Sequence, residues 1–398
     1  MNKEHISLFS KQKNIAFITD AIHSSSLSLR NLIGIAKYVQ KRRNFVLHNL
    51  PFVEISNGHI IDQFDGIIIN LCAKNTHKLL GMLNGAKLPI VDLSAEVENL
   101  ALIRVDIDLA REATIAAEWF LHRGFKNLAY CGFHGDETFP FSDILEDAFA
   151  AVVKKSGCHY ITFNMPPMTG KNKQYLRTLK RALDKWAKTL PPRTAVLCVH
   201  DRRALMLTQA CLSSGRVVPD DIAIMGRNND ITTCVCSPVT ITSVNSNLEG
   251  QGFAAMRILA SAIEHPVTPK LRPTFCVPPL GIIERESTAV YPVDPPFLAK
   301  ALLLLNENID RPVSATALAK EVGVSSTTLR TAFTKVLGIS LGKYSLSIRM
   351  REAKRLMIDE HYSIKEVAAL TGFTSQAYFS SAYRAFYGHT PSTNRPHR

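Results

Sequence analysis

The stretch GFTSQAYFSSAYRAFYGHTP, residues 372–391, has the aromatic spacing of a packed helix together with a polar face that packing does not require. Phe373, Phe379 and Tyr383 recur at helical intervals and are expected in the core. Gly372 can take the positive φ that ends a preceding helix, and Thr374 can cap the helix that follows. The residues expected on the opposite face, near the start of this second helix, are Gln376, Ala377, Ser380 and Ser381.

The same pattern occurs twice. LAKEVGVSSTTLRTAF (318–333) and VAALTGFTSQAYFSSAY (367–383) each place an alanine, a glycine four residues later, and then a hydroxylated residue. Ala319 and Ala368 suit a close crossing of two helices, and Ser325 can cap the second helix of the first copy. A single amphipathic helix is usually a solvated face, but two matched copies favour tandem helix-turn-helix units.

The positive charge of the chain is concentrated in the region of this repeat. The formal net charge is +13 over 398 residues. Residues 297–398 carry 14 Lys and Arg against 7 Asp and Glu, which is a larger excess per residue than in the rest of the chain. Such an excess is compatible with a solvated surface, and beside two helix-turn-helix units it favours binding of nucleic acid.

The repeat resembles the arabinose-regulator (AraC/XylS) family of bacterial transcription factors over about residues 313–395. The segment RMREAKRLM, residues 349–357, resembles the helix that joins the two units in that family. The resemblance implies a seven-helix domain in which each unit inserts one helix into successive major grooves of operator DNA, about 34 Å apart.

The resemblance also implies which side chains contact the operator. The two reading faces would be Ser326, Thr327, Arg330 and Thr331 in the first unit, and Gln376, Ala377, Ser380 and Ser381 in the second. Arg330 can bind guanine and Gln376 can bind adenine through paired hydrogen bonds. Lys335 and Arg384 are placed for phosphates, which position a protein without specifying sequence. Ser381 stands where many family members carry Arg, so the second unit is expected to read fewer bases.

Residues 14–284 show a different pattern of hydrophobic residues. Short β-branched runs such as IAFIT, DGIIIN, TAVLCV and DIAIMG alternate with helical stretches, which predicts mainly parallel sheets with helices on both faces. The run CVPPLGIIERESTAVYPVDPP ends this pattern and indicates a linker at about 285–296. We therefore expect an α/β effector-binding and dimerisation domain over residues 1–288 and an all-α DNA-binding domain over residues 289–398.

The α/β region resembles the core of the lactose- and galactose-repressor family, itself similar to periplasmic sugar-binding proteins. The segments that carry the resemblance include IRVDIDLAREATIAAEWFLHRGFKNLAYCGF and VLCVHDRRALMLTQACLSSGRVVPDDIAIMGRNND. It implies two α/β lobes with a ligand between them, at the carboxyl ends of the strands. The order of the two modules resembles that of the xylose-operon regulators, which implies control of catabolic genes for pentoses or related sugars.

Polar residues that follow strands are the candidates for this cleft. They are Asp20, Ser24, Asn70, Asp201 and Asn228, with Phe141 as an aromatic residue that could stack on a sugar ring. Asp and Asn also end strands simply as turn or cap residues, and this alternative stays open for each of them. Leu145 stands where family members often carry Arg, and Asn228 where they often carry Asp. The effector is therefore a sugar, a different ligand, or absent because the site is vestigial.

Other functional classes are disfavoured. His200 and Asp201 adjoin but are expected to point apart at a strand end, and no P-loop is present, so we do not expect an enzyme. The eight cysteines form no CxxC pair, and Cys234 and Cys236 lack further ligands at a recognisable spacing, so we expect neither metal nor cofactor. The polar N-terminus and the lack of a long apolar run predict a cytoplasmic protein without a membrane span. The expected partners are double-stranded operator DNA, a small-molecule effector, a second copy in a homodimer and, as a further candidate, RNA polymerase.

Overall fold

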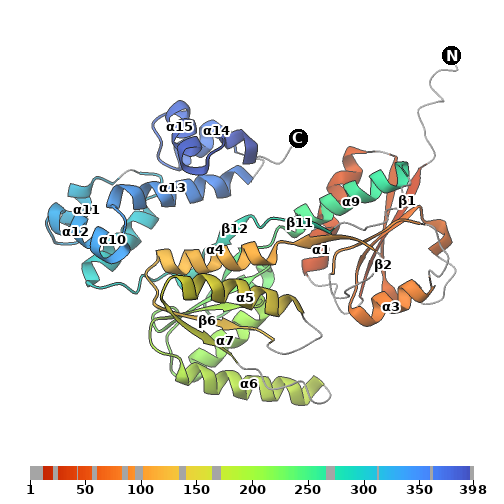
Figure 1. Cartoon of the computed structure of the whole chain (residues 1–398), viewed down its shortest axis with the longest axis horizontal. Helices are drawn as coiled ribbons and strands as arrows, with labels where there is room; N and C mark the ends of the chain where they lie inside the picture. Colours follow the sequence, from red (N-terminus) through yellow and green to blue (C-terminus); the bar gives the residue numbers. More distant parts are fainter. Residues whose placement is uncertain are drawn as a thin grey trace.

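The chain forms two α/β lobes, between which it crosses more than once, and then a helical domain (Figure 1). The computed structural model describes residues 12–20, 26–42, 44–55, 61–82, 88–94, 102–133, 140–163, 172–265, 274–311, 313–358 and 362–394. This architecture confirms the predicted fold class. No helix in these described parts is long and apolar enough to cross a membrane.

The N-terminal lobe contains a six-stranded sheet. Its elements are β1 (Lys13–Thr19), α1 (Ser26–Lys41), β2 (Phe45–Pro51), α2 (Phe52–Ile55), η3 (Ile61–Gln63), β3 (Gly66–Asn70), α3 (Ala73–Met82), β4 (Ile90–Asp92), β5 (Ile103–Ile107), α9 (Leu248–Glu264) and β11 (Thr274–Val277). The strand order is β11-β5-β4-β3-β1-β2, with parallel pairing. Buried Ile35 of α1 and Met256 of α9 pack on one face of the sheet, and Leu79 of α3 packs on the other.

The C-terminal lobe contains a second six-stranded sheet. Its elements are α4 (Leu109–His122), β6 (Asn127–Cys131), α5 (Pro140–Lys155), β7 (His159–Thr162), α6 (Asn172–Thr189), β8 (Thr194–Cys198), α7 (Asp201–Ser213), β9 (Ile222–Arg227), α8 (Ile231–Val235), β10 (Thr242–Asn245) and β12 (Gly281–Ile283). The strand order is β12-β10-β9-β8-β6-β7, and only β12 pairs antiparallel. Helices α4 and α5 share one apolar core with this sheet, and α6 and α7 share another.

Three segments connect the lobes, from β5 to α4, from β10 to α9 and from β11 to β12. Each of these segments begins at the carboxyl end of a strand, namely β5, β10 or β11. The carboxyl edges of the two parallel sheets therefore face each other across the connections, which is the edge where ligands bind in open α/β sheets.

The helical domain begins before its first helix. Its elements are α10 (Pro296–Glu307), α11 (Ala315–Glu321), α12 (Ser326–Leu337), α13 (Leu341–Ile358), α14 (Ile364–Leu370), α15 (Gln376–Tyr387) and η5 (Pro391–Asn394), preceded by η4 (Glu286–Thr288). Tyr291 and Val293, both in the predicted linker, are buried in one core with Leu302, Leu329 and Tyr344. This stretch is therefore part of the packing of the helical domain rather than a free spacer.

Helices α11 and α12 form one helix-turn-helix unit, and α14 and α15 form the other. Gly323 and Gly372 have φ values of +76° and +70°, as the sequence predicted. Ser325 caps α12 by accepting from the Thr328 amide. The predicted cap at Thr374 is wrong, because the Ser375 side chain accepts from the Tyr378 amide instead. The second turn has one extra residue, and α15 therefore begins one residue later than the repeat suggested.

Candidate ligand cleft and nucleic-acid interface

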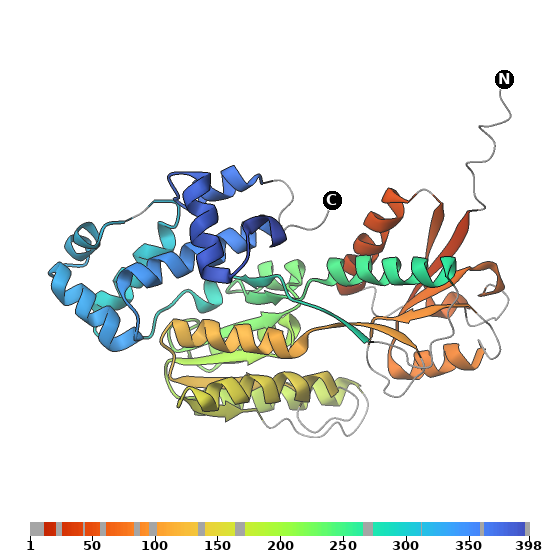
Figure 2. The ribbon, with the colours of Figure 1, turned by 45° about the horizontal axis from the view of Figure 1, so that its top comes forward.

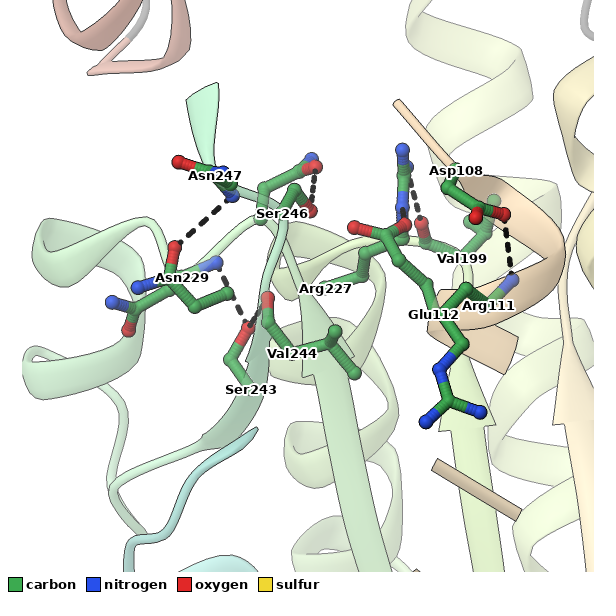
Figure 3. Close-up of polar contacts among 12 residues, drawn as sticks. Asp108, Arg111, Glu112, Val199, Arg227, Asn229, Ser243, Val244, Ser246 and Asn247 are labelled. Atoms are coloured by element: carbon green, nitrogen blue, oxygen red, sulfur yellow. Dashed lines mark hydrogen bonds and ion pairs between the residues drawn. The ribbon is translucent and has the colours of Figure 1, made fainter. Parts of the chain in front are cut away.

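A buried ion pair lies at the carboxyl edge of the C-terminal lobe. Arg227, the last residue of β9, donates from Nε to the Glu112 carboxylate in the first turn of α4 (Figure 3). Arg227 also donates to the Val199 carbonyl at 3.4 Å, and its guanidinium lies 5.8 Å from the Phe141 ring centre. Glu112 is 1% exposed and Arg227 is 9% exposed. A cation and an anion buried this deeply stabilise the fold only as a pair.

The N-terminal lobe contributes its own polar residues to the facing edge. Asp20, directly after β1, is buried and accepts hydrogen bonds from the Cys72 amide at 2.6 Å and from the Asn75 side chain. Asn70 ends β3 and donates to Asn31 at 3.3 Å. The structure thus places both predicted residues at the cleft edge, and their contact with a ligand stays a prediction. Predicted Ser24 lies outside the described residues.

The turn after β9 joins the two lobes. Asn228 and Asn229 have positive φ values of 90° and 51°. Arg30 of α1, in the other lobe, donates to the carbonyl oxygens of both, at 2.9 and 3.3 Å, and to Asn245 Oδ1 at 3.2 Å. The Asn228 side chain accepts from Ser246 at 3.1 Å. Asn228 therefore lies where the lobes meet, and Arg30 holds them in this arrangement.

Asp201 was predicted to face the cleft from its position after β8. It is buried instead. It begins α7, is 2% exposed, and accepts hydrogen bonds from Ser243 Oγ at 2.5 Å and from the Asp230 amide at 2.6 Å. Burial raises the pKa of its carboxyl to about 7, and the hydrogen bond from Ser243 opposes this shift. Asp201 therefore ties the start of α7 to β10 and to the turn after β9.

Stability should depend on pH through Asp201. Its folded pKa is raised above the unfolded value near 3.9, so its favourable contribution is full below about pH 4 and is lost as the pH rises through about 7. In the parent, the free energy of unfolding should fall by up to about 4 kcal/mol as the pH rises from about 4 to above 7. We expect Asp201→Asn to abolish this fall. Urea unfolding of parent and variant at pH 5 and pH 8 measures this, with exposed Asp220→Asn as the control. Parallel pH profiles for all three proteins would contradict the assignment.

Sequence reasoning missed three charged residues of the cleft, namely Arg30, Glu112 and Arg227. The run IMGRNND did hold a signal for Arg227, because it places a cation at the end of a buried strand. A cation buried there needs an anionic or hydrogen-bonding partner. Glu112 carries no such signal, because it lies 115 residues away on an ordinary amphipathic helix. Arg30 likewise lies 198 residues from Asn228.

The predicted reading face of the first unit is on the surface of α12. Thr327, Arg330 and Thr331 are exposed and Ser326 is half-buried. Leu329 is fully buried on the opposite side of the helix, beside Phe333 in the domain core. The exposed Lys335 lies in the last turn. This arrangement leaves the face free for DNA, and the individual base contacts stay predictions.

The second reading face is on α15. Gln376, Ala377 and Ser381 are exposed and Ser380 is half-buried, while Phe379 and Tyr383 are fully buried. The exposed Arg384 lies in the last turn. Tyr378 is an addition to the predicted set: its ring is 59% exposed beside the predicted reading residues and lies 5.7 Å from Phe373.

Helix α13 fixes the two units relative to each other. Its N-terminal half packs in the core of the first unit through Tyr344 and Ile348, and Met350 and Ala353 pack in the core of the second. Arg349 donates to the Thr371 carbonyl at 2.6 Å, and its guanidinium lies 3.8 Å from the Phe373 ring centre. The two reading helices are thus carried on one rigid element.

The C-terminal lobe contacts the helical domain through the end of α4. Arg123, the C-cap of α4, is 4% exposed, and its guanidinium lies 3.8 Å from the Trp119 ring centre and 4.5 Å from the Tyr291 ring centre. Its Nη2 pairs with Glu284. Figure 2 shows the C-terminal helices over the side of the lobe that carries α4. Partial burial, followed by the charge of Arg111 of α4, lowers the pKa of the Lys354 ammonium on α13, which agrees with this proximity.

Comparison with known proteins identifies both modules. Residues 117–288 match the periplasmic binding protein-like domain family, and residues 318–396 match a helix-turn-helix domain family. The xylose operon regulatory protein of Escherichia coli (strain K12) is 25% identical over 279 residues, which are 69% of this chain and 70% of that protein.

Solved structures show the same fold. The structure of the xylose-binding transcription activator XylR covers 98% of this chain and 99% of its own, with a TM-score of 0.60 and 22% identity. The complex of the transcriptional regulator CelR with cellobiose covers 71% of this chain and 88% of its own, with a TM-score of 0.54 and 18% identity. The predicted resemblance to xylose-operon regulators is confirmed. These relatives are transcription regulators, which confirms the predicted function class over the enzyme alternative.

Proposed function

We propose that this chain, a periplasmic binding protein-like core joined to a tandem helix-turn-helix domain, controls sugar catabolic genes in response to a pentose or related sugar held between its lobes. The observation that supports the proposal best is that α4 runs from the edge of the cleft to the helical domain. Its first turn supplies Glu112 to the cleft edge, and its last residue is followed by Arg123, which packs on Tyr291 of the helical domain. A change at the cleft therefore reaches the DNA-binding domain through one helix.

The charged groups of the cleft support a polyol ligand. Leu145 is 1% exposed and lies beside Glu112, Tyr130 and Arg227. A guanidinium that relatives often supply from the position of Leu145 is thus supplied here by Arg227 on a neighbouring strand. Guanidinium and carboxylate groups hold hydroxyls through charge-assisted hydrogen bonds.

The proposed sugar site is therefore a revised set of residues. Glu112 and Arg227 form its floor in the C-terminal lobe, and Phe141 lies beside Arg227 where a sugar ring could stack. We add Asp20 and Asn70 from the carboxyl ends of β1 and β3 in the N-terminal lobe, and Asn228 from the junction of the lobes. Asp201 is left out, because both of its carboxylate oxygens accept internal hydrogen bonds, whereas Glu112 keeps one oxygen without a partner in the described parts of the chain. A ligand shifts the lobes only by its difference in affinity for their open and closed arrangements.

For the DNA-binding domain we propose residues 289–398, which include the buried Tyr291 and Val293. Arg330 reads guanine from α12 and Gln376 reads adenine from α15, and Lys335 and Arg384 bind phosphates. Because serine at position 381 is short, the second unit contributes less direct readout. The exposed Tyr378 ring offers an apolar contact in its place.

We further propose a homodimer formed along the junction of the lobes. Leu29 on α1 is 56% exposed, and Ile231 and Val235 on α8 are 62% and 54% exposed. The hydrogen bonds of Arg30, next to Leu29, reach the turn that precedes α8, so these side chains lie along one edge. A dimer through this edge would respond to lobe closure and change the spacing of the DNA-binding domains. A regulator of this kind acts on the chromosome in the cytoplasm, where RNA polymerase is a candidate partner.

The proposal is tested with the purified full chain and the DNA upstream of its own gene. We expect retarded mobility of that DNA, and a rise in Tm with at least one member of a panel of pentoses, hexoses, sugar acids and sugar alcohols. The same compound should change the Kd for the DNA. Retarded DNA without any stabilising polyol would leave a regulator with a non-sugar or vestigial effector site. No retardation under any condition would overturn the proposed function.

A further inference from the structure

Helix α6 carries a cationic stripe on the outside of the C-terminal lobe. Residues 171–188 contain seven Lys and Arg against one Asp, and this excess of six equals the whole net charge of residues 1–296. The side chains that form the exposed stripe are Arg177, Arg181, Lys185 and Lys188. They recur every three or four residues and therefore form one line along the helix.

The apolar side of α6 holds this stripe in a fixed position. Leu179, Leu183 and Ala187 are buried against α7 and the sheet, and the Trp186 ring packs 5.0 Å from that of Phe163. The stripe lies on the opposite side of the helix, facing solvent. Its four cations form no ion pair with any residue in the described parts of the chain.

A face that served only solubility would gain from mixed charges. Arg177 and Arg181, and then Arg181 and Lys185, are like-charged pairs at i, i+4, which weaken a helix. The one acidic residue of α6, Asp184, is half-buried beside the stripe. The single sign of the stripe therefore costs the helix stability and provides a surface for a polyanion.

We propose that α6 binds the phosphate backbone of a second DNA segment while α12 and α15 hold the operator. The stripe from Arg177 to Lys188 is about 17 Å long, at 1.5 Å per residue. One strand of B-DNA carries a phosphate every 3.4 Å of axis, so the stripe spans about five phosphates. Protein interfaces are poor in lysine and rich in aromatic residues, and the stripe contains two lysines and no aromatic side chain, which disfavours a protein partner.

The position of α6 makes this a second site rather than an extension of the first. Helices α6 and α7 cover one face of the sheet, whereas α4, on the opposite face, lies toward the DNA-binding domain (Figures 1 and 2). The stripe and the DNA-binding domain thus lie toward opposite faces of this sheet, so we assign them to different duplexes. The chain would thus bridge two DNA segments, and binding at the operator raises the effective concentration of neighbouring DNA at the stripe. This inference rests on the proposed DNA-binding function.

The test measures capture of a second duplex. Upstream DNA that the chain binds is fixed to beads and saturated with full-length protein, and a labelled duplex of unrelated sequence is added at 50 mM salt. We expect capture that falls steeply between 50 and 200 mM salt. In the variant R177Q/R181Q/K185Q/K188Q we expect capture to drop at least about tenfold and its logarithmic salt slope to fall by about 3 to 4, at 0.9 per lost contact. Binding to the upstream DNA itself should change less than about twofold at 150 mM salt.

A matched control separates a local site from net charge. The variant K74Q/K126Q/K155Q/R257Q removes four exposed cations from scattered positions, and we expect it to capture the second duplex nearly as well as the parent. Equal losses in both variants, or full capture by the stripe variant, would overturn the proposal, and the latter would favour an acidic protein surface as the occupant. Absence of binding to the upstream DNA would instead count against the proposed function. Glutamine has a helix propensity close to that of Lys and Arg, and equal Tm values check that the fold is kept.

Discussion

Replacement of Glu112 by alanine is expected to lower the free energy of unfolding of the core by about 3 to 5 kcal/mol. Glu112 is the anionic partner of Arg227, and both are buried at the carboxyl edge of the C-terminal lobe. Removing the carboxylate leaves a buried cation whose remaining described hydrogen bond, to the Val199 carbonyl, is long at 3.4 Å. Urea unfolding followed by circular dichroism measures the loss, together with the loss of any sugar-induced rise in Tm.

The double variant Glu112→Leu/Arg227→Met is the control. It separates the effect of an unpaired buried charge from the effect of lost packing. A buried ion pair replaced by apolar side chains of similar volume is often neutral or stabilising, so we expect its stability to lie much closer to that of the parent. It should nevertheless fail to respond to the sugar, because both polar groups of the proposed floor are gone. If Glu112→Ala were as stable as the parent, the pair would not be buried as described. If the double variant kept the full sugar response, the proposed floor would be wrong.

The helix-turn-helix domain could be predicted closely from the sequence because its signals are local. Gly372, Phe379 and Tyr383 lie within one stretch, and the positive φ of the glycine and the burial of both rings follow from residue type and spacing. The one error was the cap of α15. The two copies could be aligned only on the alanines and glycines before the turn. An extra residue after Gly372 therefore escaped notice, and Ser375 caps the helix in place of Thr374.

The cleft could be predicted only in outline. A strand end tells which edge of the sheet a residue occupies, but the direction of its side chain depends on the neighbouring elements. Asp201 follows β8 but accepts from Ser243 of β10, two strands along the sheet, and this is visible only after the strand order is known. Arg227 and Glu112 meet through the packing of α4 on a sheet made from distant segments. Long-range pairs of this kind leave no periodic signal in a single sequence.

The linker between the modules was the least predictable part. Proline and glycine marked where the alternation of strands and helices ends, and they predicted a linker there. In the structure Tyr291 and Val293 are buried, and Val293 lies where a side chain on Gly124 would collide with it at 2.3 Å. With φ at +91°, Gly124 turns the chain sharply after α4 and leaves room for this contact. The connection is therefore a packed joint, and in the proposed function it is the route between the core and the DNA-binding domain.

Arg123→Ala is expected to separate the two functions of the chain. Its guanidinium fills the space between the Trp119 and Tyr291 rings, so alanine leaves a gap at the joint, whereas the released Glu284 is 43% exposed and can be hydrated. We expect the variant to bind sugar and DNA separately. The sugar-induced change in DNA affinity, typically 5- to 150-fold for coupled sites, should shrink to less than about twofold. Mobility shifts with and without the sugar that stabilises the parent measure this change.

A second readout does not need the ligand. Opening of the joint exposes residues 289–296, so limited proteolysis should cleave Arg123→Ala in this segment at least about tenfold faster than the parent. The control is Arg193→Ala, which removes an exposed ion pair to Asp294 on the same segment and should keep both the coupling and the protection. Arg123→Lys keeps a charge for Glu284 but loses the planar stack, and it should give an intermediate rate. Full coupling and full protection in Arg123→Ala would show that the signal travels by another route, such as the pairing of two cores.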